Sequence, residues 1–68
     1  MTIETLLNGE PRQLPTDTTV AQALDLWGYA CERVAVAVNG EFVARADYAQ
    51  RRLQARDRLD VVAPVQGG

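Results

Sequence analysis

The sequence contains no histidine, no lysine and no serine among its 68 residues. Histidine is the commonest general base in enzymes, and serine–histidine or cysteine–histidine pairs are common activated nucleophiles. Metal sites need clustered cysteine, histidine or carboxylate ligands, whereas the acidic residues here are scattered along the chain. No glycine-rich phosphate loop has a recognised spacing. The sequence therefore predicts a protein with no catalytic residue, metal or bound cofactor of its own.

Cysteine is almost absent too, and the single Cys31 excludes an internal disulfide bond. This fits a reducing compartment. No secretion signal is recognisable at the N-terminus, and the longest apolar run, residues 34–38, is too short to span a bilayer. We expect a soluble cytoplasmic protein with no membrane partner. Because a lone cysteine is usually a small buried hydrophobe, we favour that interpretation of Cys31 over a reactive, sulfur-carrying thiol.

Positive charge is scarce, since seven arginines face nine acidic residues and the net charge is −2. The nearest approach to a basic patch is a group of four arginines, Arg51, Arg52, Arg56 and Arg58. Aspartates are interleaved with this group or flank it. Nucleic-acid binding depends on clustered positive charge. The group is interpreted as a solvated surface, and no nucleic-acid partner is expected.

The first recognisable pattern is a pair of short apolar runs around Asn8-Gly9, at residues 2–7 and 12–14. An Asn-Gly pair between two such runs is the strongest local signal for a β-hairpin. Pro15 is expected to stop the second strand.

The same signal recurs at Asn39-Gly40, which joins residues 33–38 to residues 41–44 in a second predicted hairpin. The first of these runs is apolar on both faces, which is typical of a central strand. Residues 45–53 are predicted to hold a short helical turn. A last strand is predicted at residues 59–62, and Pro64 is expected to end its pairing.

Residues 16–28 predict a helix with both ends marked. Thr19 and Gln22 have the spacing of a capping box at its start, and Gly28 stands where a left-handed residue ends a helix. One apolar stripe runs along it: Val20, Ala23, Leu24 and Trp27. We interpret the stripe as the face that packs on the core.

The predicted order is strand, strand, helix, strand, strand, strand, which gives an α+β fold with one mixed sheet packed on one helix. Side chains alternate between the two faces of a strand. The face toward the helix would hold Ile3, Leu7, Val34, Val36, Val38, Leu59 and Val61. The opposite face would hold Leu6, Ala35, Ala37 and Val62, beside Glu4 and Asp60. Because a half-apolar exposed face often binds a partner, we expect Leu6 and Val62 to contact partner proteins.

Residues 1–62 are thus predicted to form a single domain, and residues 63–68 a flexible C-terminal tail. Six residues reach about 20 Å when fully extended, which is enough to enter another protein's active site. Gly67 and Gly68 present bare backbone to a narrow channel. The carboxylate of Gly68 would need activation by ATP. A sulfur nucleophile would then produce a thiocarboxylate, and a lysine an isopeptide bond.

These features resemble the β-grasp, ubiquitin-like sulfur carriers, and among them the ThiS family of thiamine biosynthesis. The resemblance covers essentially the whole chain and is carried by "LNGEP", "TVAQAL", "VAVAVNGEFVAR", "RDRLDVV" and the terminal "GG". Two departures are Ala44, where the family often has proline, and Gln66, where it frequently has a small residue.

The resemblance implies that Gly68 is adenylated by a ThiF-type enzyme that uses ATP. Sulfur from a cysteine desulfurase would convert the adenylate to a thiocarboxylate. A ThiG-type thiazole synthase would then take this sulfur into the thiazole ring. Gln66 and Gly67 would enter the partner active sites together with Gly68.

Three alternatives remain open from the sequence. The small subunit of molybdopterin synthase, of the MoaD type, is implied by the same fold and Gly-Gly end. A ubiquitin-like modifier would join Gly68 to a lysine of another protein. A plain interaction domain would make no use of the tail.

Overall fold

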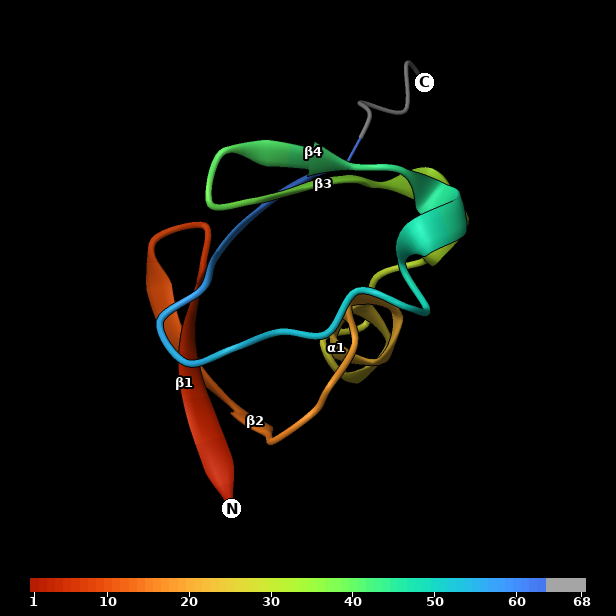
Figure 1. Cartoon of the computed structure of the whole chain (residues 1–68). Helices are drawn as coiled ribbons and strands as arrows, with labels where there is room; N and C mark the ends of the chain where they lie inside the picture. Colours follow the sequence, from red (N-terminus) through yellow and green to blue (C-terminus); the bar gives the residue numbers. More distant parts are fainter. Residues whose placement is uncertain (64–68) are drawn as a thin grey trace.

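The computed structural model describes residues 1–63 of the chain. In chain order its elements are β1 (Thr2–Leu7), β2 (Glu10–Pro15), α1 (Val20–Leu26), the 3-10 turn η1 (Cys31–Arg33), β3 (Ala35–Val38), β4 (Glu41–Val43), the 3-10 turn η2 (Arg45–Asp47) and β5 (Arg58–Val62). This is the order predicted from the sequence. Two hairpins, β1–β2 and β3–β4, stand on different sides of α1 (Figure 1).

The five strands form one mixed sheet in the order β2-β1-β5-β3-β4. Each hairpin is antiparallel, β3 is antiparallel to β5, and β1 is parallel to β5. The last strand therefore joins the two hairpins into a single sheet. The segment between η2 and β5 runs from η2 past α1 to the side of the molecule where β1 lies (Figure 1). It thus passes along one edge of the space between the sheet and α1.

Both hairpin turns were predicted correctly. Asn8 and Gly9 have φ of 50° and 88°, and Asn39 and Gly40 have φ of 54° and 85°. A two-residue turn with positive φ at both positions matches the twist of the strands that it joins. Asparagine and glycine adopt this conformation more readily than other residues.

The capping box of α1 is also confirmed. The backbone N–H of Gln22 donates to Thr19 Oγ1 at 3.2 Å, and the backbone N–H of Thr19 donates to Gln22 Oε1 at 3.0 Å. The helix ends at Leu26, and Gly28 follows with a φ of 83°. Both ends of the helix therefore lie where local chemistry places them.

The segment that follows η2 completes the N-terminus of α1. The first N–H groups of a helix have no partner within the helix. Here the N–H of Val20 donates to the carbonyl of Arg51 at 2.9 Å, and that of Ala21 donates to the carbonyl of Tyr48 at 3.0 Å. The segment thus covers the helix end and satisfies its backbone donors at the same time.

The core lies between the sheet and α1, as predicted. The helix stripe is buried at Val20, Ala23 and Leu24, while Trp27 is half-buried against the core. The predicted sheet residues are buried as well, apart from Ile3, which is half-buried. The sequence interpretation did not anticipate six further buried side chains, Thr5, Leu14, Thr18, Val43, Tyr48 and Leu53.

Three predicted strand boundaries after the helix were wrong, and one of them is the start of the last strand, which is Arg58 rather than residue 59. The strand expected from residue 33 begins at Ala35, because Cys31–Arg33 forms a 3-10 turn in which the N–H of Arg33 donates to Ala30. The strand expected to end at residue 44 ends at Val43, and η2 follows after Ala44. The helical turn predicted within residues 45–53 is present as η2.

The first hairpin also differs from expectation, whereas the predicted central strand does not. β2 is longer than residues 12–14, because an edge strand tolerates Pro11 and Pro15, which lack a backbone donor. β3 lies between β5 and β4, so the prediction of a central strand is confirmed, and the middle strand of the five is β5. It carries exposed Arg58 and Asp60, which the sheet accommodates because no described element covers its outer face.

Candidate functional site

The outer face of the sheet is the site that the sequence interpretation selected, and the strand registers confirm which side chains point there. Leu6 is half-buried on β1, and Val62 is 63% exposed on β5. Ala35 lies opposite Val62, and Ala37 lies opposite Asp60. The two alanines and Val62 therefore share one face, opposite to the buried valines of β3.

Phe42 belongs to this face and was missed. It lies opposite Ala37 in the β3–β4 register and is 73% exposed. The signal was present in the sequence, because side chains alternate along a strand and the next residue, Val43, faces the core. Ala35, Ala37, Phe42 and Val62 together form an exposed apolar area, called the sheet patch below.

The two predicted docking residues do not lie together. Leu6 is paired with Arg58, and Val62 stands four residues further along β5. At about 3.3 Å per residue this separates them by about 13 Å. On the outer face, Arg58 lies beside Leu6, and Asp60 lies between Arg58 and Val62. Val62 thus belongs to the sheet patch, whereas Leu6 forms a separate apolar spot with Pro11, its partner on β2.

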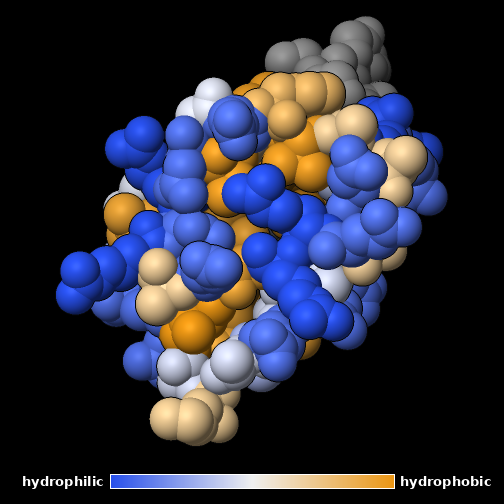
Figure 2. Space-filling view, viewed as in Figure 1, coloured by the Kyte–Doolittle hydropathy of each residue, from blue (hydrophilic) through white to orange (hydrophobic). Residues whose placement is uncertain are grey.

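The sheet patch lies where the described chain ends. Val62 is the last residue of β5, and Ala63 is the last described residue. The tail residues predicted to enter partner active sites, Gln66, Gly67 and Gly68, lie outside the described residues. Figure 2 shows hydrophobic surface over β3 and β4 at this end of the molecule, with hydrophilic side chains over much of the rest of the view. A partner that held this surface would therefore receive the chain as it leaves the sheet.

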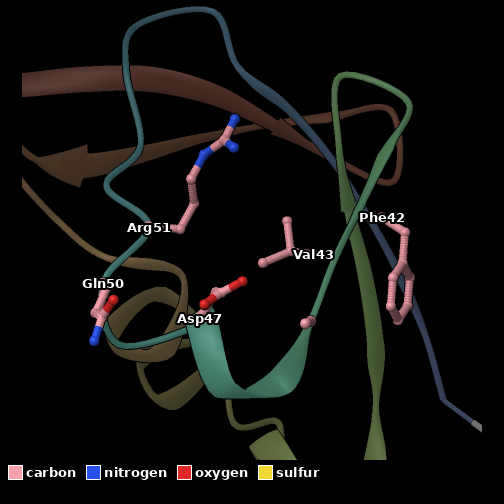
Figure 3. A pocket seen from close by; sticks show the side chains of 6 residues that line it. Phe42, Val43, Asp47, Gln50 and Arg51 are labelled. Atoms are coloured by element: carbon pink, nitrogen blue, oxygen red, sulfur yellow. The ribbon is translucent and has the colours of Figure 1, made fainter.

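A shallow pocket of about 280 Å³ adjoins β4 on the side of η2. Val43, Asp47 and Arg51 point toward its space, whereas Phe42 points away from it (Figure 3). A carboxylate and a guanidinium line the same wide opening. The pocket therefore has no net charge that would select an anion or a cation, and we assign no function to it.

Cys31 is half-buried at the first position of η1. Its Sγ lies 3.9 Å from the carbonyl oxygen of Ala21, and the side chain packs against the core. A hollow beside it is lined by Glu32 and Arg45, so the surroundings carry both signs of charge. This position agrees with the interpretation of Cys31 as a packing residue.

Within residues 1–63 no three or more histidine, cysteine, aspartate or glutamate side chains gather closely enough to hold a metal ion. No helix in that range has the length and apolar character needed to cross a membrane.

A mixed five-stranded sheet folded around one helix, with parallel contact between its first and last strands, defines an α+β protein of the β-grasp class. The structure is similar to the crystal structure of the thiamine biosynthesis protein ThiS from Geobacter metallireducens, with a TM-score of 0.82. The likeness covers 97% of this chain and all of that one at 23% sequence identity, and it establishes the fold.

The family model of the ThiS family matches residues 5–68, and the chain belongs to this family. Two curated relatives are named thiazole synthase. The one from Magnetococcus marinus is 40% identical over 62 residues, and the one from Paramagnetospirillum magneticum is 36% identical over 63 residues. These matches include 91% and 93% of this chain but only 19% of each relative. The chain thus spans about a fifth of the length of the curated relatives that it matches.

Proposed function

We propose that the chain is a sulfur carrier for the formation of the thiazole ring of thiamine. The observation that carries the proposal is the match to the ThiS family, which extends to residue 68 and so includes Gly67 and Gly68. In this proposal the chain is not an enzyme. It is a protein-borne substrate, and the carboxylate of Gly68 is the group that reacts.

The chemistry requires two steps. A carboxylate is a poor electrophile, so a ThiF-type enzyme first transfers AMP from ATP to Gly68, which releases pyrophosphate and leaves an acyl adenylate. Sulfide can then attack the acyl carbon, and AMP leaves as the carbon–sulfur bond forms. If the sulfur comes instead as a persulfide from a cysteine desulfurase, the same attack gives an acyl disulfide, and a second thiol then cleaves its sulfur–sulfur bond, forming a disulfide and releasing the thiocarboxylate. The product is a thiocarboxylate on Gly68. ATP is bound by the activating enzyme and not by the carrier.

The relatives support a ThiG-type thiazole synthase as the acceptor. Each relative named thiazole synthase carries a segment similar to this chain within one longer polypeptide. Linking two modules that must meet raises their effective concentration without any new contact. We infer that this chain likewise binds to a thiazole synthase as a sulfur carrier.

The sheet patch is the proposed docking surface for these partners. It combines exposed Phe42 and Val62 with two small alanines, which allow close approach of a partner. Aromatic residues are enriched among those that contribute most to interface affinity. A partner bound there lies beside the point where the chain leaves β5.

The test is the intact mass of the carrier after incubation with ATP, sulfide and a purified ThiF-type enzyme. We expect a mass increase equal to the difference between a sulfur and an oxygen atom, localised to Gly68. Without sulfide, an AMP adduct is expected instead. A variant that ends at Gly67 is the matched control, and we expect it to gain neither mass.

Two outcomes would contradict the proposal. One is the absence of both adducts on the full chain, and the other is equal modification of the shortened control. A thiocarboxylate consumed by molybdopterin synthase rather than by a thiazole synthase would move the chain to the pterin pathway. An isopeptide to a lysine of another protein would make it a modifier.

A further inference from the structure

The side chain of Asn8 binds both backbone groups of Val61, a residue 53 positions away. The N–H of Val61 donates to Asn8 Oδ1 at 2.8 Å, and Asn8 Nδ2 donates to the carbonyl of Val61 at 3.3 Å. The backbone N–H of Asn8 also donates to the carbonyl of Leu59 at 2.9 Å. One turn residue thus holds β5 at two successive positions of the same edge.

These bonds replace a part of the sheet that β1 cannot form. β1 pairs with β5 only through Leu6 and Leu7, because the chain turns into the hairpin at Asn8 with a φ of 50°. If the parallel ladder continued, the backbone carbonyl of Asn8 would accept a hydrogen bond from the N–H of Val61. The side-chain oxygen of Asn8 accepts that bond instead. The ladder is thereby extended to the residue that precedes Val62.

Asn39 provides an internal comparison. It occupies the same position of the other Asn-Gly turn, with a φ of 54°, and its side chain also binds β5. Its Oδ1 accepts from the N–H of Arg58 at 2.9 Å, and its Nδ2 donates to Asp57 Oδ1 at 3.0 Å. The two asparagines therefore hold opposite ends of β5, and only Asn8 holds the end that leads to Gly68.

We propose that Asn8 is a positioning residue that fixes the end of β5 and thereby aims the following residues at the partner active site. The inference depends on the proposed function. Gly68 is the sixth residue after Val62, so it can lie at most about 20 Å from the end of β5. A shift of Val61 and Val62 moves the point from which these residues have to reach the partner active site. Reaction rates are sensitive to misplacement of the reacting group by about 1 Å.

The test compares Asn8→Gly with Asn39→Gly in adenylation by a ThiF-type enzyme. Glycine accepts the positive φ of both turns, so both variants keep their hairpins and lose only a side chain. For Asn8→Gly we expect kcat to fall about tenfold while KM for the carrier stays within about twofold. For Asn39→Gly we expect both constants to stay within about twofold.

Asn8→Asp tests the bonds themselves. Aspartate tolerates the turn and keeps the acceptor for the N–H of Val61, but it cannot donate to the carbonyl of Val61. We expect its kcat to lie between those of the natural protein and of Asn8→Gly. Amide hydrogen exchange of Val61, measured on the free carrier, is expected to accelerate about tenfold in Asn8→Gly and to stay unchanged in Asn39→Gly.

The outcomes separate this inference from the proposed function. If the natural chain gains no AMP adduct, the proposed function fails, and the positioning role fails with it. If the natural chain reacts and Asn8→Gly reacts with the same kcat, the positioning role alone is wrong. An unchanged exchange rate at Val61, or an equal loss of kcat in Asn39→Gly, would also overturn it.

Discussion

At the scale of single residues, Tyr48 joins three parts of the fold. Its ring is buried, its hydroxyl donates to the carbonyl of Val34 at 3.1 Å, and its own carbonyl accepts from the N–H of Ala21. The side chain therefore links the segment after η2 to the start of β3. Because this bond is buried, its loss leaves a carbonyl without its partner.

Tyr48→Phe is expected to lower the free energy of unfolding by about 1–2 kcal/mol, since the ring still fills its place while the donor is removed. Urea unfolding followed by tryptophan fluorescence measures this. Tyr29→Phe is the matched control, because Tyr29 is half-buried and no hydrogen bond of its hydroxyl is present within residues 1–63. An equal loss in both variants would show that the hydroxyl of Tyr48 has no specific role.

Residue-level contacts were predictable from the sequence only where both partners are close in the chain. The capping box joins residues three positions apart, and each turn asparagine precedes its glycine directly. The bonds from Tyr48 to Val34 and from Asn8 to Val61 connect residues 14 and 53 positions apart. No local pattern indicates such partners, because they meet only after the sheet has formed.

At the scale of elements, α1 has seven residues and could not persist alone, since isolated helices of this length are unstable in water. Its start is held by the Thr19 cap and by the carbonyls of Tyr48 and Arg51. Tertiary contacts and the cap therefore act on the same turn. The helix was nevertheless predictable, because its cap, stripe and terminal glycine are all local signals.

Thr19→Ala is expected to lower the free energy of unfolding by about 1 kcal/mol, because the N–H of Gln22 loses its acceptor. Chemical unfolding monitored by circular dichroism measures the change. Thr16→Ala is the control, since the hydroxyl of Thr16 makes an exposed bond to Met1 outside the helix. Its effect should stay within about 0.5 kcal/mol. If the two variants lose equal stability, the capping box contributes nothing particular.

The position of β5 could not be predicted at this scale. Its alternating polar residues, Arg58 and Asp60, are typical of a strand with one solvated face. Such a pattern does not indicate which strands pair with it on either side. The continuous apolar run of β3 correctly predicted a strand with neighbours on both sides, since β3 lies between β5 and β4. The outward alanines of β3 belong to the sheet patch.

At the scale of the whole molecule, the fold places apolar side chains on both faces of its sheet. One face of the sheet is covered by α1 and by the segment after η2, and it forms the core. No element within residues 1–63 covers the other face, which carries the sheet patch next to the end of the described chain. The alternation of side chains predicted both faces, but grouping Phe42 with Val62 required the registers of three strands.

The proposed docking role of the sheet patch is tested with two exposed apolar side chains on opposite sides of the molecule. Phe42 lies in the sheet patch and is 73% exposed, while Leu26 lies on α1 and is 63% exposed. Neither Phe42→Ser nor Leu26→Ser should change the free energy of unfolding by more than about 1 kcal/mol. If the two variants differ in partner binding by more than this, the difference is due to the loss of a surface contact and not to a loss of stability.

For Phe42→Ser we expect KM of the carrier in adenylation to rise about tenfold, because an aromatic side chain buried in an interface commonly contributes more than 1 kcal/mol to binding. For Leu26→Ser we expect KM to stay unchanged. Steady-state release of pyrophosphate by a ThiF-type enzyme measures both. An equal rise of KM in the two variants would indicate that any loss of exposed apolar surface weakens binding, and not the loss of the sheet patch in particular. An unchanged KM in Phe42→Ser would place the docking surface elsewhere, and the separate apolar spot around Leu6 would then be the next face to substitute.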